Sequence, residues 1–153
     1  MEPPQAAPPV GPIGIGGWLI LMAIGQVLGP LRALAAMAMT YINKEVLFAF
    51  GEIPVSMYGG LVIDLVFVMF LIVTSTVFFA RKRIFKIMFT IEAISLLAIN
   101  PLEYLWMSAT STLTFGELVN PDDVGNGLAG FIIGLIWVVY LWRSKRVANT
   151  FVN

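Results

Sequence analysis

Three charged side chains lie within stretches of sequence that are otherwise apolar: Arg32, Asp64 and Glu92. A charged residue at the centre of a membrane helix costs about 2.5–3.5 kcal/mol on insertion scales, so each of the three needs a physical reason. Arg32 and Asp64 lie at similar predicted depths, roughly 10 and 8 Å below the ends of their helices. A hydrogen-bonded pair between them would neutralise both charges, and we expect such a pair to fix the register of the two helices.

Glu92 has no cation at its depth on another predicted helix. A carboxyl in a dry, low-dielectric interior favours its neutral form, and proton-coupled transporters use such groups. A neutral acid bonded to Ser95 or Thr90, or an ion pair with Lys86, accounts for Glu92 without any substrate. The sequence leaves these alternatives open.

The sequence contains few residues that could support enzyme catalysis. The sequence contains no cysteine and no histidine, which removes the thiol nucleophile, the disulfide, the soft-metal site, the imidazole base and the haem ligand. Only one aspartate lies within a predicted span, so there is no aspartate pair for hydrolysis inside the membrane. Gly14-x-Gly16-Gly17 follows no strand and predicts a turn before Trp18, not a phosphate-binding loop. We expect no enzyme activity, cofactor or metal.

The composition defines the class of protein that has to position these residues. Of the 153 residues, 59% are hydrophobic and 12% are charged, whereas soluble domains have about 45–50% apolar and about 25% charged residues. At about 20 residues per membrane helix, the chain has room for four spans with short connections. Isolated strands cannot satisfy their backbone groups in lipid. The sequence therefore predicts an all-α integral membrane four-helix bundle, with the lipid bilayer as its first partner.

The predicted spans follow from four apolar stretches, at about residues 15–39, 59–80, 85–106 and 124–142. Residues 1–13 are rich in proline and predict a disordered tail, and residues 14–153 form the membrane domain. A cleaved signal peptide is the rival interpretation of the first stretch, although no basic residue precedes Trp18. Residues 46–50 predict an interfacial helix or a re-entrant turn. Tyr104 is one of several aromatic residues expected to anchor span ends at the headgroups.

Basic residues indicate the orientation of the bundle. Seven of them flank the predicted spans on one side, and the positive-inside rule places that side and both termini in the cytoplasm. The formal net charge of zero gives no field that would attract nucleic acid. The seven are Arg81, Lys82, Arg83, Lys86, Arg143, Lys145 and Arg146.

Two pairs of glycines at helical spacing predict close helix contacts. They are Gly25-x-x-x-Gly29 in the first span and Gly130-x-x-x-Gly134 in the fourth. Glycines at this spacing allow two backbones to approach without side chains between them. The contacts could lie within one bundle, or could hold a homodimer or a membrane-protein partner.

Sequence motifs near both ends of the chain resemble one family. The first end has Gly16-Gly-Trp-Leu followed by Pro30-Leu-Arg32, and the second has Ser144-Lys-Arg-Val147. Together with the basic turn after the second span, they resemble the bacterial membrane proteins called domain of unknown function 2569. The resemblance covers nearly the whole chain, and it implies a small four-helix domain in the bacterial cytoplasmic (inner) membrane. It implies no particular activity.

Two functions fit these residues. The first is a structural or protein-interaction bundle held by the Arg32–Asp64 pair. The second is a transporter or channel for a small solute, ion or proton, in which Asp64 and Glu92 face a polar cavity. The two hypotheses differ in whether water reaches those acidic side chains.

Overall fold

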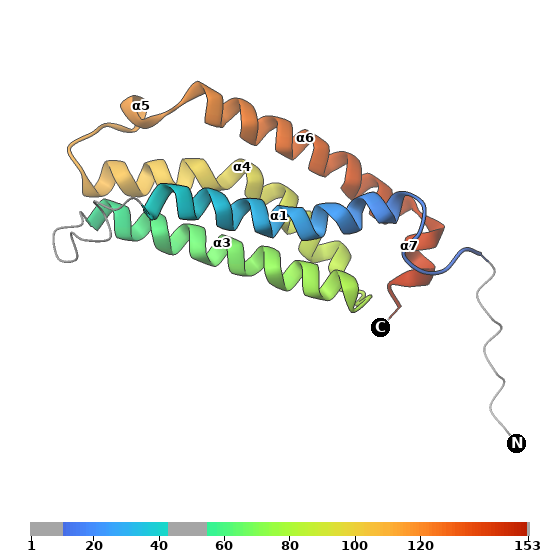
Figure 1. Ribbon diagram of the computed structural model, residues 1–153. Coiled ribbons are helices and arrows are strands. Elements are labelled where there is room, and N and C mark those ends of the chain that lie inside the picture. Colours follow the sequence, from blue (N-terminus) through green and yellow to red (C-terminus); the bar gives the residue numbers. More distant parts are fainter. Residues whose placement is uncertain (1–10, 43–54, 153) are drawn as a thin grey trace, which may run out of the picture.

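The computed structural model describes residues 11–42 and 55–152, and this part of the chain is helical without any strand (Figure 1). Four helices are long and apolar enough to cross a membrane: α1 (Trp18–Tyr41), α3 (Val55–Phe79), α4 (Phe85–Thr110) and α6 (Pro121–Arg143). Two short helices follow α4 and α6: α5 (Phe115–Leu118) and α7 (Lys145–Thr150). For this part of the chain, the prediction of an all-α fold with four helices able to span a membrane is confirmed. The predicted interfacial segment at 46–50 and most of the proline-rich tail lie outside the described residues.

The third span is longer than the sequence pattern predicts. Helix α4 continues through Pro101 to Thr110, where the prediction ended at residue 106. Proline is tolerated within membrane helices because neighbouring groups satisfy the freed carbonyl. The extension adds about one helical turn beyond the predicted end. Helix α6 starts at Pro121 because the Asn120 side chain accepts a hydrogen bond from the Asp122 N–H at 3.0 Å.

The four long helices run side by side, with α4 packed against both α3 and α6, and α1 packed against α3 (Figure 1). We call the end that holds α7, the start of α1 and the α3–α4 turn the terminal end, and the opposite end the loop end. Helices α1 and α6 meet near the terminal end, where the rings of Trp18 and Trp137 are 6.4 Å apart. Toward the loop end, α1 and α6 diverge (Figure 1).

Glycines of α6 set its close approach to α4. A Cβ on the buried Gly134 would lie 2.8 Å from Cβ of Ala93, and one on Gly130 would lie 3.5 Å from Cδ1 of Leu96. The second glycine pair therefore packs within the bundle. The first pair does not, because a Cβ on Gly25 or Gly29 would meet nothing within 4 Å in the described structure.

The core lies at the terminal end and is largely aromatic. Helix α7 folds back beneath the bundle, so that Phe151 stacks on Phe85 with ring centroids 5.0 Å apart and lies 5.5 Å from Phe78. Ser144 begins this turn, since its side chain accepts a hydrogen bond from the Val147 N–H at 3.4 Å. The residues that form this aromatic core are Leu19, Met22, Phe78, Phe85, Phe89, Leu141, Val147 and Phe151.

The sequence motifs from the two ends of the chain meet at this core. The Gly14 N–H donates a hydrogen bond to Oγ1 of Thr150 at 2.9 Å, and a Cβ on Gly16 would collide with the guanidinium of Arg146. Gly17 has φ 57°, a left-handed conformation that glycine adopts without strain, and this conformation turns the chain into α1. The fold thus explains why a family resemblance would involve both ends of the chain.

Replacing Gly134 tests the packing of α6 on α4. Gly134→Ala should lower the free energy of unfolding by about 1–3 kcal/mol, because the new methyl group forces the two helices apart. Gly29→Ala is the control and should not destabilise the bundle, because its methyl group meets nothing. Adding Ala93→Gly to Gly134→Ala should recover part of the loss. Unfolding in detergent measures all three variants, and equal effects of the two glycine replacements would contradict the close contact.

Candidate functional site

Glu92 lies on α4, about 10 Å along the helix from its terminal end, and it has a partner on α1. Nε2 of Gln26 donates a hydrogen bond to Oε1 of Glu92 at 3.4 Å. Gln26 is only 4% exposed, so this bond lies inside the bundle. Oε2 of Glu92 is also buried, and it has no hydrogen-bond partner within the described residues. One oxygen of an intramembrane carboxyl is therefore left without a partner.

Ser75 extends this contact to a third helix. Its Oγ lies 2.6 Å from the backbone carbonyl oxygen of Gln26 and 3.2 Å from Oε1 of the same side chain. The hydroxyl is also 2.8 Å from the carbonyl oxygen of Leu71 on its own helix. Ser75, Gln26 and Glu92 thus form one polar group that connects α3, α1 and α4. Ser75 thus holds Gln26, and Gln26 in turn positions the Glu92 carboxyl.

A cavity of about 280 Å³ borders this polar group. It lies between α1, α4 and α6, at the seam where α1 and α6 diverge. Gly25, Gly130 and Gly134 line it, and because they have no side chains they leave space beside Glu92. The remaining lining is mostly apolar and includes Trp137. Glu92 is thus an acid beside a largely apolar cavity inside the membrane.

Apolar side chains lie on either side of Glu92 along the bundle. Leu96 lines it, and also lines a second cavity of about 200 Å³ toward the loop end. The second cavity contains polar groups of Asn100, Tyr104 and Asp123. On the other side of Glu92, Phe89 lines the first cavity and belongs to the aromatic core. Glu92 therefore lies between a leucine barrier and an aromatic barrier.

Acidic residues gather at the loop end. Asp64 on α3 lies beside the Tyr41 hydroxyl and the Glu103 carboxyl. The hydroxyl of Tyr104 donates a hydrogen bond to Oδ2 of Asp123 at 2.7 Å. Tyr104 is buried, so the prediction that it anchors a span end at the headgroups is wrong.

The short helix α5 covers this acidic region. Phe115 packs edge-on against Tyr104, with ring centroids 6.1 Å apart. The Thr114 N–H donates to Oε2 of Glu117 at 2.8 Å, and the Thr114 hydroxyl donates to the same oxygen at 2.7 Å. These two bonds favour the carboxylate and hold the pKa of Glu117 below its usual value. The capping box fixes the start of α5 beside Tyr104.

The structure does not bring Arg32 and Asp64 together. Arg32 is exposed, whereas Asp64 neighbours Tyr41 and Glu103. Two residues at equal depth in neighbouring helices meet only if each also lies on the side of its helix that faces the other helix. Gln26 lies on the inward face of α1, and Arg32, six residues later, is turned about 120° away from it. The pair expected to hold the bundle is replaced by the bond between Gln26 and Glu92.

The side chains proposed as local partners of Glu92 contact other groups instead. The hydroxyls of Ser95 and Thr90 donate to the carbonyl oxygens of Ile91 and Lys86, at 2.8 and 2.7 Å. Nζ of Lys86 lies over the ring of Trp142, 5.9 Å from its centroid. The partner comes from another helix, which no local pattern around Glu92 reveals.

Sequence reasoning missed Gln26 as the partner of Glu92, and it missed Glu103 as a membrane residue. Both had a signal. Gln26 is four residues after Met22 and seven after Leu19, which places it on the same buried face of α1. Glu103 is eleven residues after Glu92, about three helical turns, which places both acids on one face of α4.

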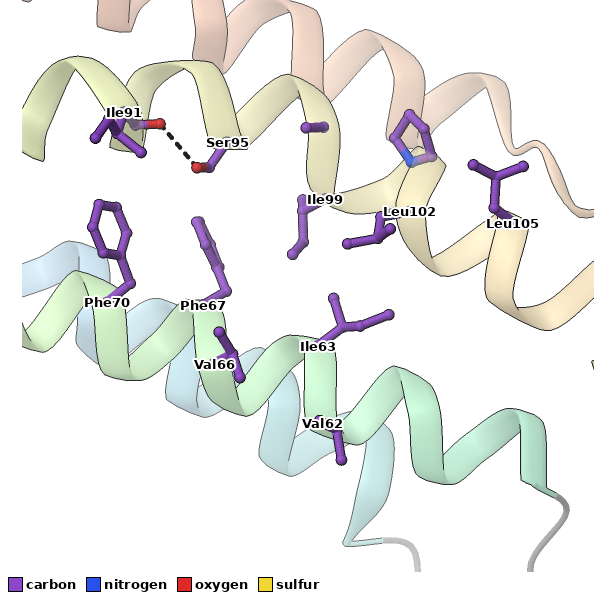
Figure 2. Close-up of a pocket in the computed structure, with 12 residues that line it drawn as sticks. Val62, Ile63, Val66, Phe67, Phe70, Ile91, Ser95, Ile99, Leu102 and Leu105 are labelled. Carbon is purple, nitrogen blue, oxygen red and sulfur yellow. Dashed lines mark hydrogen bonds between the residues drawn. The ribbon is translucent and has the colours of Figure 1, made fainter.

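A larger cavity lies away from the polar site. It is a groove of about 590 Å³ between α3 and α4, and Figure 2 shows its apolar lining from both helices. Ser95 faces this groove, but its hydroxyl bonds to Ile91 on its own helix, as the dashed line in Figure 2 marks. The groove offers hydrocarbon contact and little else, which suits the acyl chains of a bilayer.

The fold and the Glu92 group define a class of protein: a four-helix membrane bundle with a polar group inside the membrane. The chain belongs to the family described as "Protein of unknown function (DUF2569)", whose profile matches residues 12–152. The resemblance seen in the two end motifs is therefore confirmed. Neither the curated proteins nor the solved structures contain a match to this chain.

A double-mutant cycle tests the bond between Gln26 and Glu92. Gln26→Leu should lower the free energy of unfolding by about 1–3 kcal/mol, because it leaves a buried carboxyl without a donor. Combining it with Glu92→Leu should restore most of this loss, since both polar partners are then removed together. Unfolding of each variant in detergent gives the coupling energy. Ser95→Ala is the control, and strictly additive effects of the two leucine substitutions would contradict the bond.

Proposed function

We propose that this protein binds and transfers protons within the membrane, with Glu92 as the proton-carrying group. The observation that carries the proposal is the buried Oε2 of Glu92, which has no hydrogen-bond partner among the described residues and lies beside a cavity. A charged oxygen without a partner is costly in a membrane interior, and protonation removes that cost. A carboxyl that exchanges a proton across a cavity is the usual chemistry of proton-coupled transport.

The oxygen atoms available favour a proton over a metal cation. Hard cations such as Ca²⁺ take six or more oxygen ligands. Beside the Glu92 carboxyl, the described polar group offers the side-chain oxygen of Gln26, which already lies 3.2 Å from Ser75. A proton needs only the unpartnered carboxyl oxygen. Gln26, as a donor to the other oxygen, holds the carboxyl in place without competing for the proton.

The arrangement of barriers supports transfer in two steps. Protons from the loop end would reach the second cavity through the region of Asp64, Glu103 and Asp123, and Leu96 then separates them from Glu92. Release toward the terminal end requires Phe89 and the aromatic core to move. Coupled transport by Glu92 would require the Leu96 and Phe89 barriers to open one at a time, as in alternating access.

We propose that the terminal end faces the cytoplasm of a bacterial cell, which puts this chain in the cytoplasmic membrane. Seven of the nine basic residues support this orientation through the positive-inside rule. We also propose that the role is not enzymatic, because the sequence offers neither cysteine nor histidine for catalysis. The structural or interaction role is the alternative, and it requires Glu92 to lie in a dry, sealed interior.

Proton flux into vesicles tests the function directly. The purified protein is reconstituted into vesicles that contain a pH-sensitive dye, and a potassium gradient with valinomycin supplies the driving potential. The wild-type protein should acidify the vesicles faster than protein-free vesicles do. Glu92→Gln keeps the shape of the side chain but cannot exchange the proton, so its rate should fall to the protein-free rate. Glu117→Gln, outside the spans, should keep the wild-type rate. Flux that is unchanged in Glu92→Gln would exclude Glu92 as the proton carrier.

Water access to the cavity beside Glu92 is a separate test. Because the sequence contains no cysteine, only the introduced cysteine can react with the reagent. Ile133→Cys lines the cavity beside Glu92 and should react with a membrane-impermeant thiol reagent. Ile136→Cys lies on the same helix outside that cavity, and Ser95→Cys lies in the apolar groove, so both should be protected. Adding Leu96→Ala to Ile133→Cys should speed labelling from the loop end. Complete protection of Ile133→Cys would mean a dry core and would favour the interaction role.

A further inference from the structure

Basic residues form two segments that lie far apart in the sequence. The first occupies the turn between α3 and α4 and the start of α4, and the second joins α6 to α7. Residues 65–91 and 124–152, which contain these segments, have no aspartate or glutamate. Five of the seven side chains are exposed, and Lys86 and Arg146 are half-buried. We call them together the basic face: Arg81, Lys82, Arg83, Lys86, Arg143, Lys145 and Arg146.

Aromatic contacts bring the two segments together. Phe78 and Phe85 flank the α3–α4 turn, and Phe151, directly after α7, packs on both of them. A second contact joins the start of α4 to the end of α6, because Nζ of Lys86 lies over the ring of Trp142. The Trp142 ring nitrogen also lies 3.3 Å from Oγ1 of Thr90. The position of α7 is thus set by the same core that fixes the basic turn.

The basic face lies where lipid headgroups are. It forms the terminal end of four helices that are long and apolar enough to span a membrane, so its cations border the edge of the hydrocarbon. The acidic residues of the described spans lie elsewhere: Glu92 in the interior, and Asp64, Glu103, Asp122 and Asp123 toward the loop end. The exposed ammonium and guanidinium groups are therefore free to pair with anions supplied by the membrane.

We propose that the basic face binds the phosphate of an anionic phospholipid, and that it does so as one surface built by α7 and the α3–α4 turn. Arginine and lysine pair strongly with phosphate oxygens, and two clustered segments can contact one headgroup from two sides. General attraction to a charged bilayer depends only on the number of cations. A built surface also depends on the aromatic contacts that hold the two segments together.

Native mass spectrometry of the full-length protein in detergent, with added phosphatidylglycerol or phosphatidylcholine, tests this proposal. The wild-type protein should retain phosphatidylglycerol and release phosphatidylcholine. The variants R81Q/K82Q/R83Q and R143Q/K145Q/R146Q should each weaken phosphatidylglycerol binding, by about fivefold per charge removed. Arg32→Gln removes a cation outside the basic face and should leave binding unchanged. Equal retention of the two lipids, or wild-type binding by either triple variant, would overturn the proposal.

Phe151→Ala distinguishes a built surface from general attraction, because it removes no charge. It should release α7 from the aromatic core and weaken phosphatidylglycerol binding, whereas Val152→Ala, at an exposed position, should not. Unchanged binding in a folded Phe151→Ala variant would overturn the built surface. If that variant does not fold, the two glutamine variants still decide whether the basic face binds the lipid. Competition by excess inorganic phosphate would show that the site takes a free anion, which would overturn the assignment to a lipid.

Discussion

The cost of placing a polar group in hydrocarbon governs this structure more than any other interaction. A carboxyl inside a membrane has to be neutral, paired or hydrogen-bonded, because no water is present to solvate it. Gln26 supplies one hydrogen bond to Glu92, and Ser75 contacts Gln26 from a third helix. These contacts require α1, α3 and α4 to meet at one depth. The same cost makes the unpartnered oxygen of Glu92 the feature of the fold that most needs a functional explanation.

The packing of the helices differs between the two ends of the bundle. At the terminal end, phenylalanines from α3, α4 and the segment after α7 form a closed core, and the chain segment before α1 is bonded to Thr150. Toward the loop end, α1 and α6 diverge, and glycines of α6 and α1 leave a cavity beside Glu92. A bundle that is sealed at one end and divergent at the other gives an intramembrane acid unequal surroundings on its two sides.

Charge is separated along the bundle as well. Acids of the described spans lie in the interior or toward the loop end, whereas the basic face occupies the terminal end. The acids at the loop end meet tyrosine hydroxyls and a neighbouring carboxyl, so their interactions lie within the protein. The exposed cations at the terminal end instead point to partners in the membrane. On the two proposals, Glu92 would handle protons about 10 Å along α4 from the terminal end, and the basic face would contact lipid at that end, with Phe89 and the aromatic core between them.

The sequence by itself determined the class of the protein, the number and order of its spans, and the motifs of its family. These depend on composition, on apolar length and on local residue patterns, all of which can be counted along the chain. The sequence did not determine which residues of different helices contact each other. Depth along a helix can be counted from the sequence, but the rotation of one helix against another cannot, and so Arg32 was paired with Asp64 and Gln26 was overlooked. Only the tertiary structure decided that Glu92 meets Gln26, that Leu96 lies between two cavities, and that α7 returns to the core. Each of these results depends on how side chains from different helices pack, and that packing is a property of the whole bundle.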